Sequence, residues 1–231
     1  MFNGFPEETV RFFLDLRFHN DAAFFNENRE RYRQDVQAPF YEFIEELAPL
    51  MQSIDPLMEV RPYKCLARIR RDTRFTKDKS PYRDHLWLCF RRMAEPRDES
   101  LNYFFEFGPG TLGWGLGFWG ENRRAMDMLR RQMAAQPQRI LDIIDDCRLP
   151  EHQLMLGGSR FKRLAVPENI PPQLEPWYTT KELYIGRWQP EYHWAYTPEL
   201  IDIVRKDFIA LAPLYRHLRG ICDDIQDQAD V

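Results

Sequence analysis

The chain has 231 residues, of which 44% are hydrophobic, so its length and composition predict one domain with a single large core. Its formal net charge is -4 at pH 7, which argues against a general electrostatic attraction to nucleic acid or to an anionic membrane. The first eight residues hold no basic segment followed by an apolar one, and no run of about 18 uncharged apolar residues occurs. We therefore expect a soluble protein of the cytoplasm, with its four widely spaced cysteines reduced and no metal bound.

The first fifty residues show hydrophobic patterns typical of helices. Pro6 suits the first turn of one helix, and Asn20 or Asp21 can cap a second. A third helix, with Pro39 near its start, has an apolar stripe through residues 40–51 and glutamates on the opposite side. The sequence therefore predicts an N-terminal layer of helices with one face to bury.

From residue 65 onward the hydrophobic pattern changes to the period of two that is typical of strands. Four strands are predicted, over residues 65–70, 85–90, 101–107 and 112–119. In the first, Leu66, Arg68 and Arg70 would share one face. The short turn at Pro109-Gly110 favours an antiparallel hairpin of the last two strands. One or two more strands are expected near residues 181–188.

Helical patterns return after Gly120, from Pro137 and from Thr197. At the last of these, Thr197 can cap a helix whose first residue is Pro198, and the apolar positions continue to Leu214. We find no repeat and no linker. The predicted fold class is therefore α+β, a single domain over residues 1–231 with a central antiparallel sheet of about four to six strands flanked by N-terminal and C-terminal helices.

The densest cluster of charge lies between residues 68 and 84. It contains Arg68, Arg70, Arg71, Arg74, Lys77, Lys79 and Arg83 against Asp72, Asp78 and Asp84, and seven positive minus three negative charges leave a local surplus of +4. Guanidinium groups bind carboxylate and phosphate in a forked, bidentate way. The sequence therefore predicts a cleft for a small anionic ligand that bears a phosphate or a carboxylate. Its expected contacts are Arg68, Arg70, Arg74, Lys77, Lys79 and Tyr82.

Two other interpretations of this basic segment stay open. In the first, Asp72, Asp78 and Asp84 pair with neighbouring arginines, while Phe75 and Tyr82 hold the loop against the core, so the segment is purely structural. In the second, the loop is an interaction module that docks on an acidic protein surface or on RNA. A concave site with converging arginines would favour a small ligand, and a convex patch would favour a macromolecule.

Weaker signals lie in the C-terminal half. The segment Gly157-Gly158-Ser159-Arg160-Phe161-Lys162-Arg163 places flexible backbone beside cations but lacks the spacing of a P-loop, so we expect a plain turn. Lys162 and Lys181 would join the basic site as outlying members if the fold brings them near Arg74. Residues 177–196 are rich in Trp and Tyr, but the glutamates among them favour packing over the binding of nucleic acid. We therefore do not expect nucleic acid as a partner.

Residues 112–118 alternate large apolar side chains with Gly113, Gly115 and Gly117. At a period of two the glycines remove the side chains from one face of a strand. We expect a helix to pack closely there, in preference to a ligand.

No activated nucleophile and no set of metal ligands is visible in the sequence. The five histidines show no H-x-x-x-H or H-E-x-x-H spacing, and no G-x-S-x-G motif is present. We expect Glu106, between Phe105 and Phe107, to be a buried partner of Arg68 or Arg70, with an acid–base role as the alternative. Whether the chain is an enzyme therefore stays open, and no cofactor is expected. If the basic site is catalytic, its chemistry would be the stabilisation of charge on a phosphate or carboxylate substrate.

The twelve residues from Arg71 to Tyr82, RDTRFTKDKSPY, resemble the domain of unknown function family 2461, a family of largely bacterial proteins. The resemblance extends to Phe24-Phe25 with Asn28 and Tyr32, and to Gly158, Lys162-Arg163 and Lys181. Phe24 stands where the family has Trp, and Glu175-Pro176-Trp177-Tyr178 replaces a more aliphatic segment. The resemblance implies one full-length cytosolic domain and points to the segment 71–82, but it implies no activity, cofactor or partner.

Overall fold

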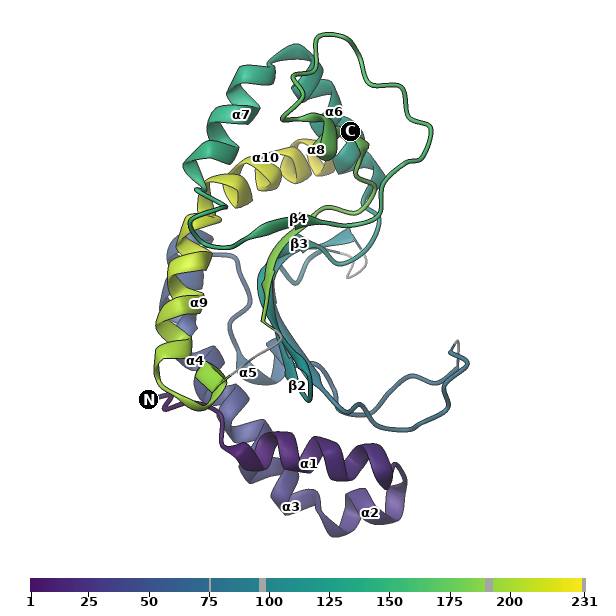
Figure 1. The fold of residues 1–231 in the computed structure, drawn as a ribbon, viewed down its shortest axis with the longest axis vertical. Helices are drawn as coiled ribbons and strands as arrows, with labels where there is room; N and C mark the ends of the chain where they lie inside the picture. Colours follow the sequence, from purple (N-terminus) through teal and green to yellow (C-terminus); the bar gives the residue numbers. More distant parts are fainter. Residues whose placement is uncertain (75, 96–98, 190–192, 230–231) are drawn as a thin grey trace. The chain divides into compact units, whose positions relative to one another are not determined.

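The computed structural model describes residues 1–74, 76–95, 99–189 and 193–229 (Figure 1). Its contacts divide the chain into two compact units. Unit 1 comprises Met1–Phe90, Phe104–Trp114 and Trp188–Arg205, and unit 2 comprises Arg91–Tyr103, Gly115–Arg187 and Lys206–Val231. That both units form the single domain expected over residues 1–231 stays a prediction.

Among the described residues, five strands form one antiparallel sheet with the order β1-β2-β3-β5-β4. The strands are β1 (Leu86–Arg91), β2 (Leu101–Gly108), β3 (Thr111–Phe118), β4 (Met155–Gly157) and β5 (Tyr184–Trp188). The turn at residues 109–110 joins the neighbouring strands β2 and β3, as the Pro109-Gly110 pair predicts. The α+β class and the central antiparallel sheet of four to six strands are thus confirmed.

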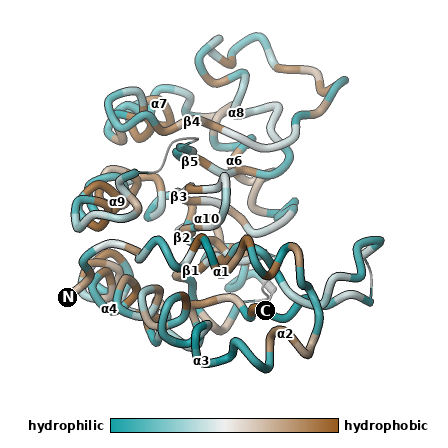
Figure 2. The backbone as a smooth tube through the Cα atoms, turned by 60° about the horizontal axis from the view of Figure 1, so that its bottom comes forward, coloured by the Kyte–Doolittle hydropathy of each residue, from teal (hydrophilic) through white to brown (hydrophobic). Residues whose placement is uncertain are grey.

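Helices form most of the N-terminal part of unit 1. They are α1 (Glu7–Phe18), α2 (Ala22–Glu27), α3 (Arg29–Arg31), the π-helix η1 (Tyr32–Gln37), α4 (Ala38–Ile54) and α5 (Pro62–Cys65). Pro6 precedes α1, and the Asp21 side chain caps α2 by accepting a hydrogen bond from the backbone N–H of Phe24 at 2.9 Å. Figure 2 shows hydrophobic and hydrophilic stretches alternating along α1 and α4, as expected for helices with one buried face.

Aromatic rings build the core of unit 1. Phe5 lies between α4 and β2, with its ring centroid 4.8 Å from that of Phe40 and 5.9 Å from that of Phe105. Phe43 packs on Phe105 at 4.4 Å, and all four side chains are almost completely buried. This cluster joins the N-terminal segment, α4 and the sheet, and it holds the helices that later form the site.

The predicted strand over residues 65–70 is wrong. Pro62 starts the short helix α5, which ends only at Cys65, and the residues that follow make isolated bridges instead of a continuous ladder. Leu66 bridges Leu88 of β1, and Arg70 bridges Tyr82. After the bridge to β1 at Leu66, the segment pairs across the base of the basic loop, where the N–H of Arg83 donates to the carbonyl oxygen of Ile69 at 2.9 Å.

In unit 2 the helices are α6 (Arg123–Ala135), α7 (Pro137–Asp146), α8 (Glu175–Thr179) and α10 (Ala212–Ala229), and α6 and α7 both contact α10. The single C-terminal helix that the sequence predicts is divided at Leu211 into α9 (Glu199–Ala210) and α10, and the 3-10 helix η3 (His193–Tyr196) precedes α9. No helix of the described residues is both long enough and apolar enough to cross a bilayer.

The glycines of β3 serve a different purpose from the one predicted. A Cβ atom on Gly115 would lie 2.0 Å from the carbonyl oxygen of Ile185, and one on Gly117 would lie 2.5 Å from the Cβ of Tyr184. Both neighbours belong to β5, so the glycines admit a strand, and the prediction of a closely packed helix is wrong. The close approach lies between β3 and β5, which are neighbours in the sheet.

The aromatic segment 177–196 is largely packed, in agreement with the expectation. Trp177 and Ala195 are buried, Trp194 and Tyr196 are half-buried, and Trp188 is exposed to 40%. Glu191 and Tyr192, which belong to the same segment, lie outside the described residues.

Candidate functional site

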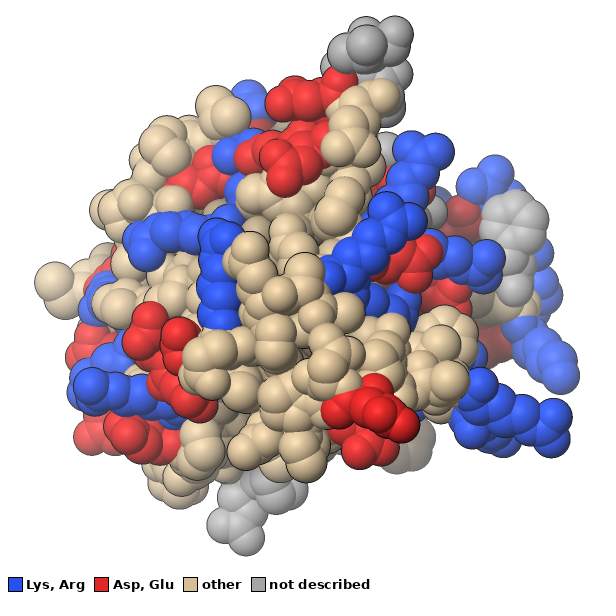
Figure 3. Space-filling view, turned by 90° about the horizontal axis from the view of Figure 1, so that it is seen from above, with Lys and Arg blue, Asp and Glu red and all other residues tan. Residues whose placement is uncertain are grey.

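The basic loop, residues 71–81, extends from the body of unit 1 as an arm in both Figure 1 and Figure 2. Arg74, Lys77 and Lys79 are exposed on it. In Figure 3 the arm lies at the right edge, where basic side chains spread outward with acidic ones between them. The arm therefore does not gather these three cations into a hollow.

Ion pairs within the arm match much of the structural interpretation. Arg74 binds Asp72 with 2.7 Å between Nη2 and Oδ2, Arg71 pairs with Asp78, and Lys79 donates to the carbonyl oxygen of Thr73 at 2.8 Å. The guanidinium of Arg74 lowers the pKa of Asp72 to about 2. The third aspartate departs from the expectation, because Asp84 pairs with Arg17 of α1 at 2.7 Å.

The base of the arm is fastened to the junction of α1 and α2. Asn20 donates to the carbonyl oxygen of Tyr82 at 3.0 Å and accepts from its backbone N–H at 2.9 Å. The Tyr82 ring is buried and stacks on Phe25, with 4.3 Å between centroids. Tyr82 therefore anchors the arm, as the structural interpretation expects of it, whereas Phe75 lies outside the described residues.

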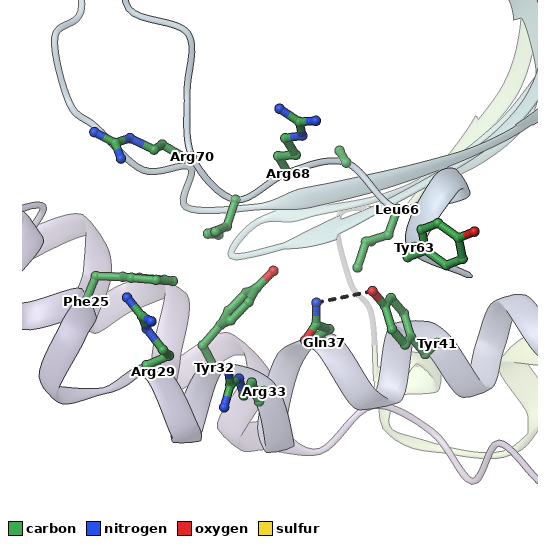
Figure 4. Close-up of a pocket in the computed structure, with 12 residues that line it drawn as sticks. Phe25, Arg29, Tyr32, Arg33, Gln37, Tyr41, Tyr63, Leu66, Arg68 and Arg70 are labelled. Carbon is green, nitrogen blue, oxygen red and sulfur yellow. Dashed lines mark hydrogen bonds between the residues drawn. The ribbon is translucent and has the colours of Figure 1, made fainter. Parts of the chain in front are cut away.

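A cavity of about 380 Å³ lies beside this anchor, between the helices α2 to α4 and the segment 63–70 (Figure 4). The described residues that line it are Phe25, Arg29, Tyr32, Arg33, Gln37, Tyr41, Tyr63, Leu66, Ala67, Arg68, Ile69 and Arg70. Four of these residues are arginines, and none is an aspartate or a glutamate. Its volume is within the range of small-molecule sites.

The π-helix η1 forms the floor of the cavity and contributes Tyr32, Arg33 and Gln37 to it. Short π-helical turns are rare and occur frequently at functional sites. The Tyr32 hydroxyl points from this floor toward the segment that carries Arg68 (Figure 4). Within the described part of the chain this hydroxyl has no hydrogen-bond partner. Burial, together with the nearby Tyr41, raises the pKa of Tyr32 well above its usual range, so the group stays an O–H donor at neutral pH.

The arginines form the rim, and all four are exposed. Arg29 donates to Asn26 at 2.8 Å, and Arg33 lies 3.5 Å from Glu30. The side chains of Arg68 and Arg70 have no hydrogen bond or ion pair to any described residue. Figure 4 shows the guanidinium of Arg68 directed away from the helices and that of Arg70 extending outward past the end of the cavity that holds Phe25. Two guanidinium groups are thus available to an anion without breaking an existing ion pair.

Arg83 hydrogen-bonds to the backbone of the segment that carries Arg68 and Arg70. Its Nη1 atom donates to the carbonyl oxygens of Arg68 and Arg70 at 3.0 and 2.8 Å, and its guanidinium lies 4.7 Å from the Trp87 ring centroid. Arg83 thereby holds in place the backbone that carries Arg68 and Arg70.

Glu106 does not partner Arg68 or Arg70, so that prediction is wrong. Its carboxylate lies 3.4 Å from Nε2 of His85, whose Nδ1 contacts Asp84 at 3.0 Å. Burial raises the pKa of Glu106, while His85 opposes the shift. Glu106, His85 and Asp84 do not line the cavity. Within the described residues, no group of three His, Cys, Asp or Glu side chains is placed to hold a metal ion.

Lys162 and Lys181 belong to unit 2. Lys162 is exposed, while Nζ of Lys181 lies 5.1 Å from the ring centroid of Phe161, with Arg130 at 5.2 Å from the same ring. Lys181 and Arg130 also line a second cavity of about 330 Å³, but Glu121 and Asp127 line it too. Its charges are largely balanced, because Asp127 pairs with Arg130 at 2.7 Å.

Several residues of the first cavity are absent from the sequence prediction. They are Phe25, Arg29, Tyr32, Arg33, Gln37, Tyr41 and Tyr63. The spacing of four between Arg29, Arg33 and Gln37 would have placed them along one side of a helix. Their approach to residues 66–70 depends on the tertiary fold, and no pattern in the sequence indicates it.

The fold and the site define an α+β protein with an arginine-rimmed cavity next to a basic arm. The family model described as conserved hypothetical protein (DUF2461) matches residues 8–217, and the chain belongs to this family. No curated protein and no solved structure matches the chain.

Proposed function

We propose that the protein binds a small anionic molecule, bearing a phosphate or a carboxylate, in the arginine-rimmed cavity of unit 1. The observation that carries this proposal is the pair Arg68 and Arg70, which have no ion pair to any described residue and line a cavity whose described lining has no carboxylate. Arg29 and Arg33 also line it, but Arg33 lies 3.5 Å from Glu30. Fixed positive charge that lacks a nearby counter-charge favours an anionic guest.

The geometry suggests a division of roles within the cavity. Arg68 and Arg70 supply charge from the rim, and the Tyr32 hydroxyl supplies a neutral donor from the floor. An anion about 4 Å from one guanidinium gains about 1 kcal/mol in water and about 4 kcal/mol at the dielectric near a protein surface. Because these arginines are exposed, we expect about 0.5–1 kcal/mol from each, and weaker binding at high salt.

The arm has a separate role in this proposal. Arg74 and Lys79 already have partners within the arm, which supports the structural interpretation for this part of the basic segment. The contacts that the sequence predicts from Arg74, Lys77, Lys79, Tyr82, Lys162 and Lys181 are untested and are not part of this proposal, because none of these residues lines the first cavity.

A cytoplasmic location is part of the proposal. All four cysteines are described and none forms a disulfide, as is usual in a reducing compartment. If the site also catalyses a reaction, the arginines and the Tyr32 hydroxyl would stabilise charge that develops on the bound phosphate or carboxylate.

Titration calorimetry with inorganic phosphate tests the proposal on the wild type, the double variant Arg68→Ala/Arg70→Ala and the control Arg74→Ala. Arg74 is a suitable control because it is an exposed arginine of the same segment, is paired with Asp72 and lies outside the cavity lining. We expect the double variant to weaken binding by about tenfold or more and the control to leave it unchanged. Absence of phosphate binding to the wild type, or an equal loss in Arg74→Ala, would contradict the proposal.

The interaction alternative gives a different result in a parallel measurement. Binding of RNA or of an acidic protein would follow the exposed arm, so it would decrease in a Lys77→Ala/Lys79→Ala variant and remain in Arg68→Ala/Arg70→Ala. RNA binding would also weaken steeply as salt is added.

A further inference from the structure

We infer, resting on the anion site proposed above, that the ligand carries its anionic group on a flat aromatic or heteroaromatic body. The chemistry of the cavity is divided along its length (Figure 4). One end holds Arg29 and Arg70 beside Phe25, and the opposite end holds Tyr41 and Tyr63. An amphipathic guest fits this division better than a bare inorganic anion, which would leave the aromatic end unused.

The aromatic end offers a surface for stacking. Tyr63 is exposed to 60%, and its ring has Arg61 and Lys64 at 5.8 and 5.7 Å from the centroid. Leu66 points into the cavity next to it, and Tyr41 faces it from α4 (Figure 4). A large ring that stays mostly in water in the absence of a guest gains contact area when a second flat ring covers it.

Polar groups at this end suit the edge of a heteroaromatic ring. Gln37 donates from Nε2 to the hydroxyl of Tyr41 at 3.3 Å, which fixes the orientation of its amide. The amide oxygen of Gln37 has no hydrogen-bond partner among the described residues, so it remains able to accept one. A ring N–H or an exocyclic amino group of a guest could donate to it.

The size of the cavity agrees with a guest of this kind. About 380 Å³ lies near the lower limit of the volumes that hold small organic ligands. The space suits one ring system with one anionic group, as in an aryl phosphate or a nucleoside monophosphate. A long polyanion or a large dinucleotide would exceed it.

The experiment compares inorganic phosphate, methyl phosphate, phenyl phosphate and adenosine monophosphate as titrants of the full-length protein. We expect phenyl phosphate and adenosine monophosphate to bind about tenfold tighter than methyl phosphate, which is a usual effect of one stacked ring. In Tyr63→Ala this advantage should disappear, while the affinity for inorganic phosphate stays unchanged. The exposure of Tyr63 makes loss of folding by this variant unexpected.

Phe161→Ala is the matched control, because Phe161 is also an exposed ring with two cations near it, Arg130 at 5.2 Å and Lys181 at 5.1 Å from its centroid, but it lies in unit 2. This variant should keep the full advantage of the aromatic ligands. Equal affinities for phenyl and methyl phosphate would overturn the inference, and if Arg68→Ala/Arg70→Ala still weakens phosphate binding, the anion site stands without it. Binding of none of the four titrants overturns both. An aromatic advantage that is lost in Phe161→Ala and kept in Tyr63→Ala would place the aromatic ligand in unit 2 and refute the inference.

Discussion

Tyr32→Phe is the substitution that best separates a binding residue from a structural one, because it removes a single hydroxyl and keeps the ring. The Tyr32 ring packs against Phe25 at 5.4 Å and against Phe12 at 5.8 Å, and these contacts survive the change. The hydroxyl has no hydrogen-bond partner in the described part of the chain. Its removal should therefore cost the fold no hydrogen bond.

The expected changes in stability and in phosphate affinity follow from the burial of Tyr32, which is only 7% exposed. An unpaired buried polar group costs about 1–3 kcal/mol, and access to water from the cavity reduces this, so we expect the free energy of unfolding to rise by up to about 1 kcal/mol. For a chain of this length such a gain raises Tm by about 2–4 °C. Phosphate binding should weaken by about tenfold, since a hydrogen bond to a charged group contributes about 1.5–3 kcal/mol.

Urea unfolding and phosphate titration of the same samples measure both effects. Tyr103→Phe is the control: Tyr103 is completely buried, and its hydroxyl donates to the carbonyl oxygen of Phe208 at 3.3 Å. That variant should lose about 1 kcal/mol of unfolding free energy and bind phosphate normally. The reasoning is refuted if Tyr32→Phe loses as much stability as Tyr103→Phe and binds phosphate as the wild type does.

Three further predictions concern the framework of the site. Glu59→Gln should lower the free energy of unfolding at pH 7 by about 1–2 kcal/mol, because hydrogen bonds from Arg61 lower the pKa of Glu59 to about 2. This contribution is present above the unfolded pKa of about 4.5 and is lost as the pH falls toward 2. Urea unfolding should therefore give the same stability for the two proteins near pH 2. Asn20→Ala removes both hydrogen bonds to the Tyr82 backbone, and we expect faster tryptic cleavage of the arm at unchanged helix content by circular dichroism; an unchanged cleavage rate would contradict the anchor. Gly117→Ala should destabilise by about 2 kcal/mol or more in thermal unfolding, since a Cβ meets β5 at 2.5 Å, and a neutral effect would show that β3 and β5 are not so closely packed.

Local signals in the sequence predicted the helices and strands well where the deciding interaction is short in range. Pro6, the Asp21 cap and Pro39 each act within one turn of their helix, and the hairpin of β2 and β3 depends on the two-residue turn between them. The prediction failed at residues 65–70, where alternating residues indicate a strand. There the segment bridges β1 only at Leu66 and then pairs with residues 81–83, a change of partner that the alternating pattern does not indicate.

The charge cluster shows how much of a candidate site a sequence pattern can predict. It indicated a surplus of positive charge, but adjacent residues in a projecting arm diverge, so Arg74, Lys77 and Lys79 do not meet in the cavity. Arg68 and Arg70, which precede the arm, do line the cavity, and their contact with a ligand stays a prediction. Glu106 was assigned to these arginines because of its sign alone, whereas its register on β2 places it beside His85.

By itself the sequence determined the α+β class, the caps and turns, and the presence of a segment with a surplus of positive charge, because each depends on neighbouring residues or on total charge. Only the tertiary structure decided which cations face a cavity and which aromatic residues share it with them. Residues 25–41 and 63–70 meet there through packing of the helices on the sheet, and the hydrophobic pattern that drives this packing specifies which faces are buried but not which distant segments they bury against.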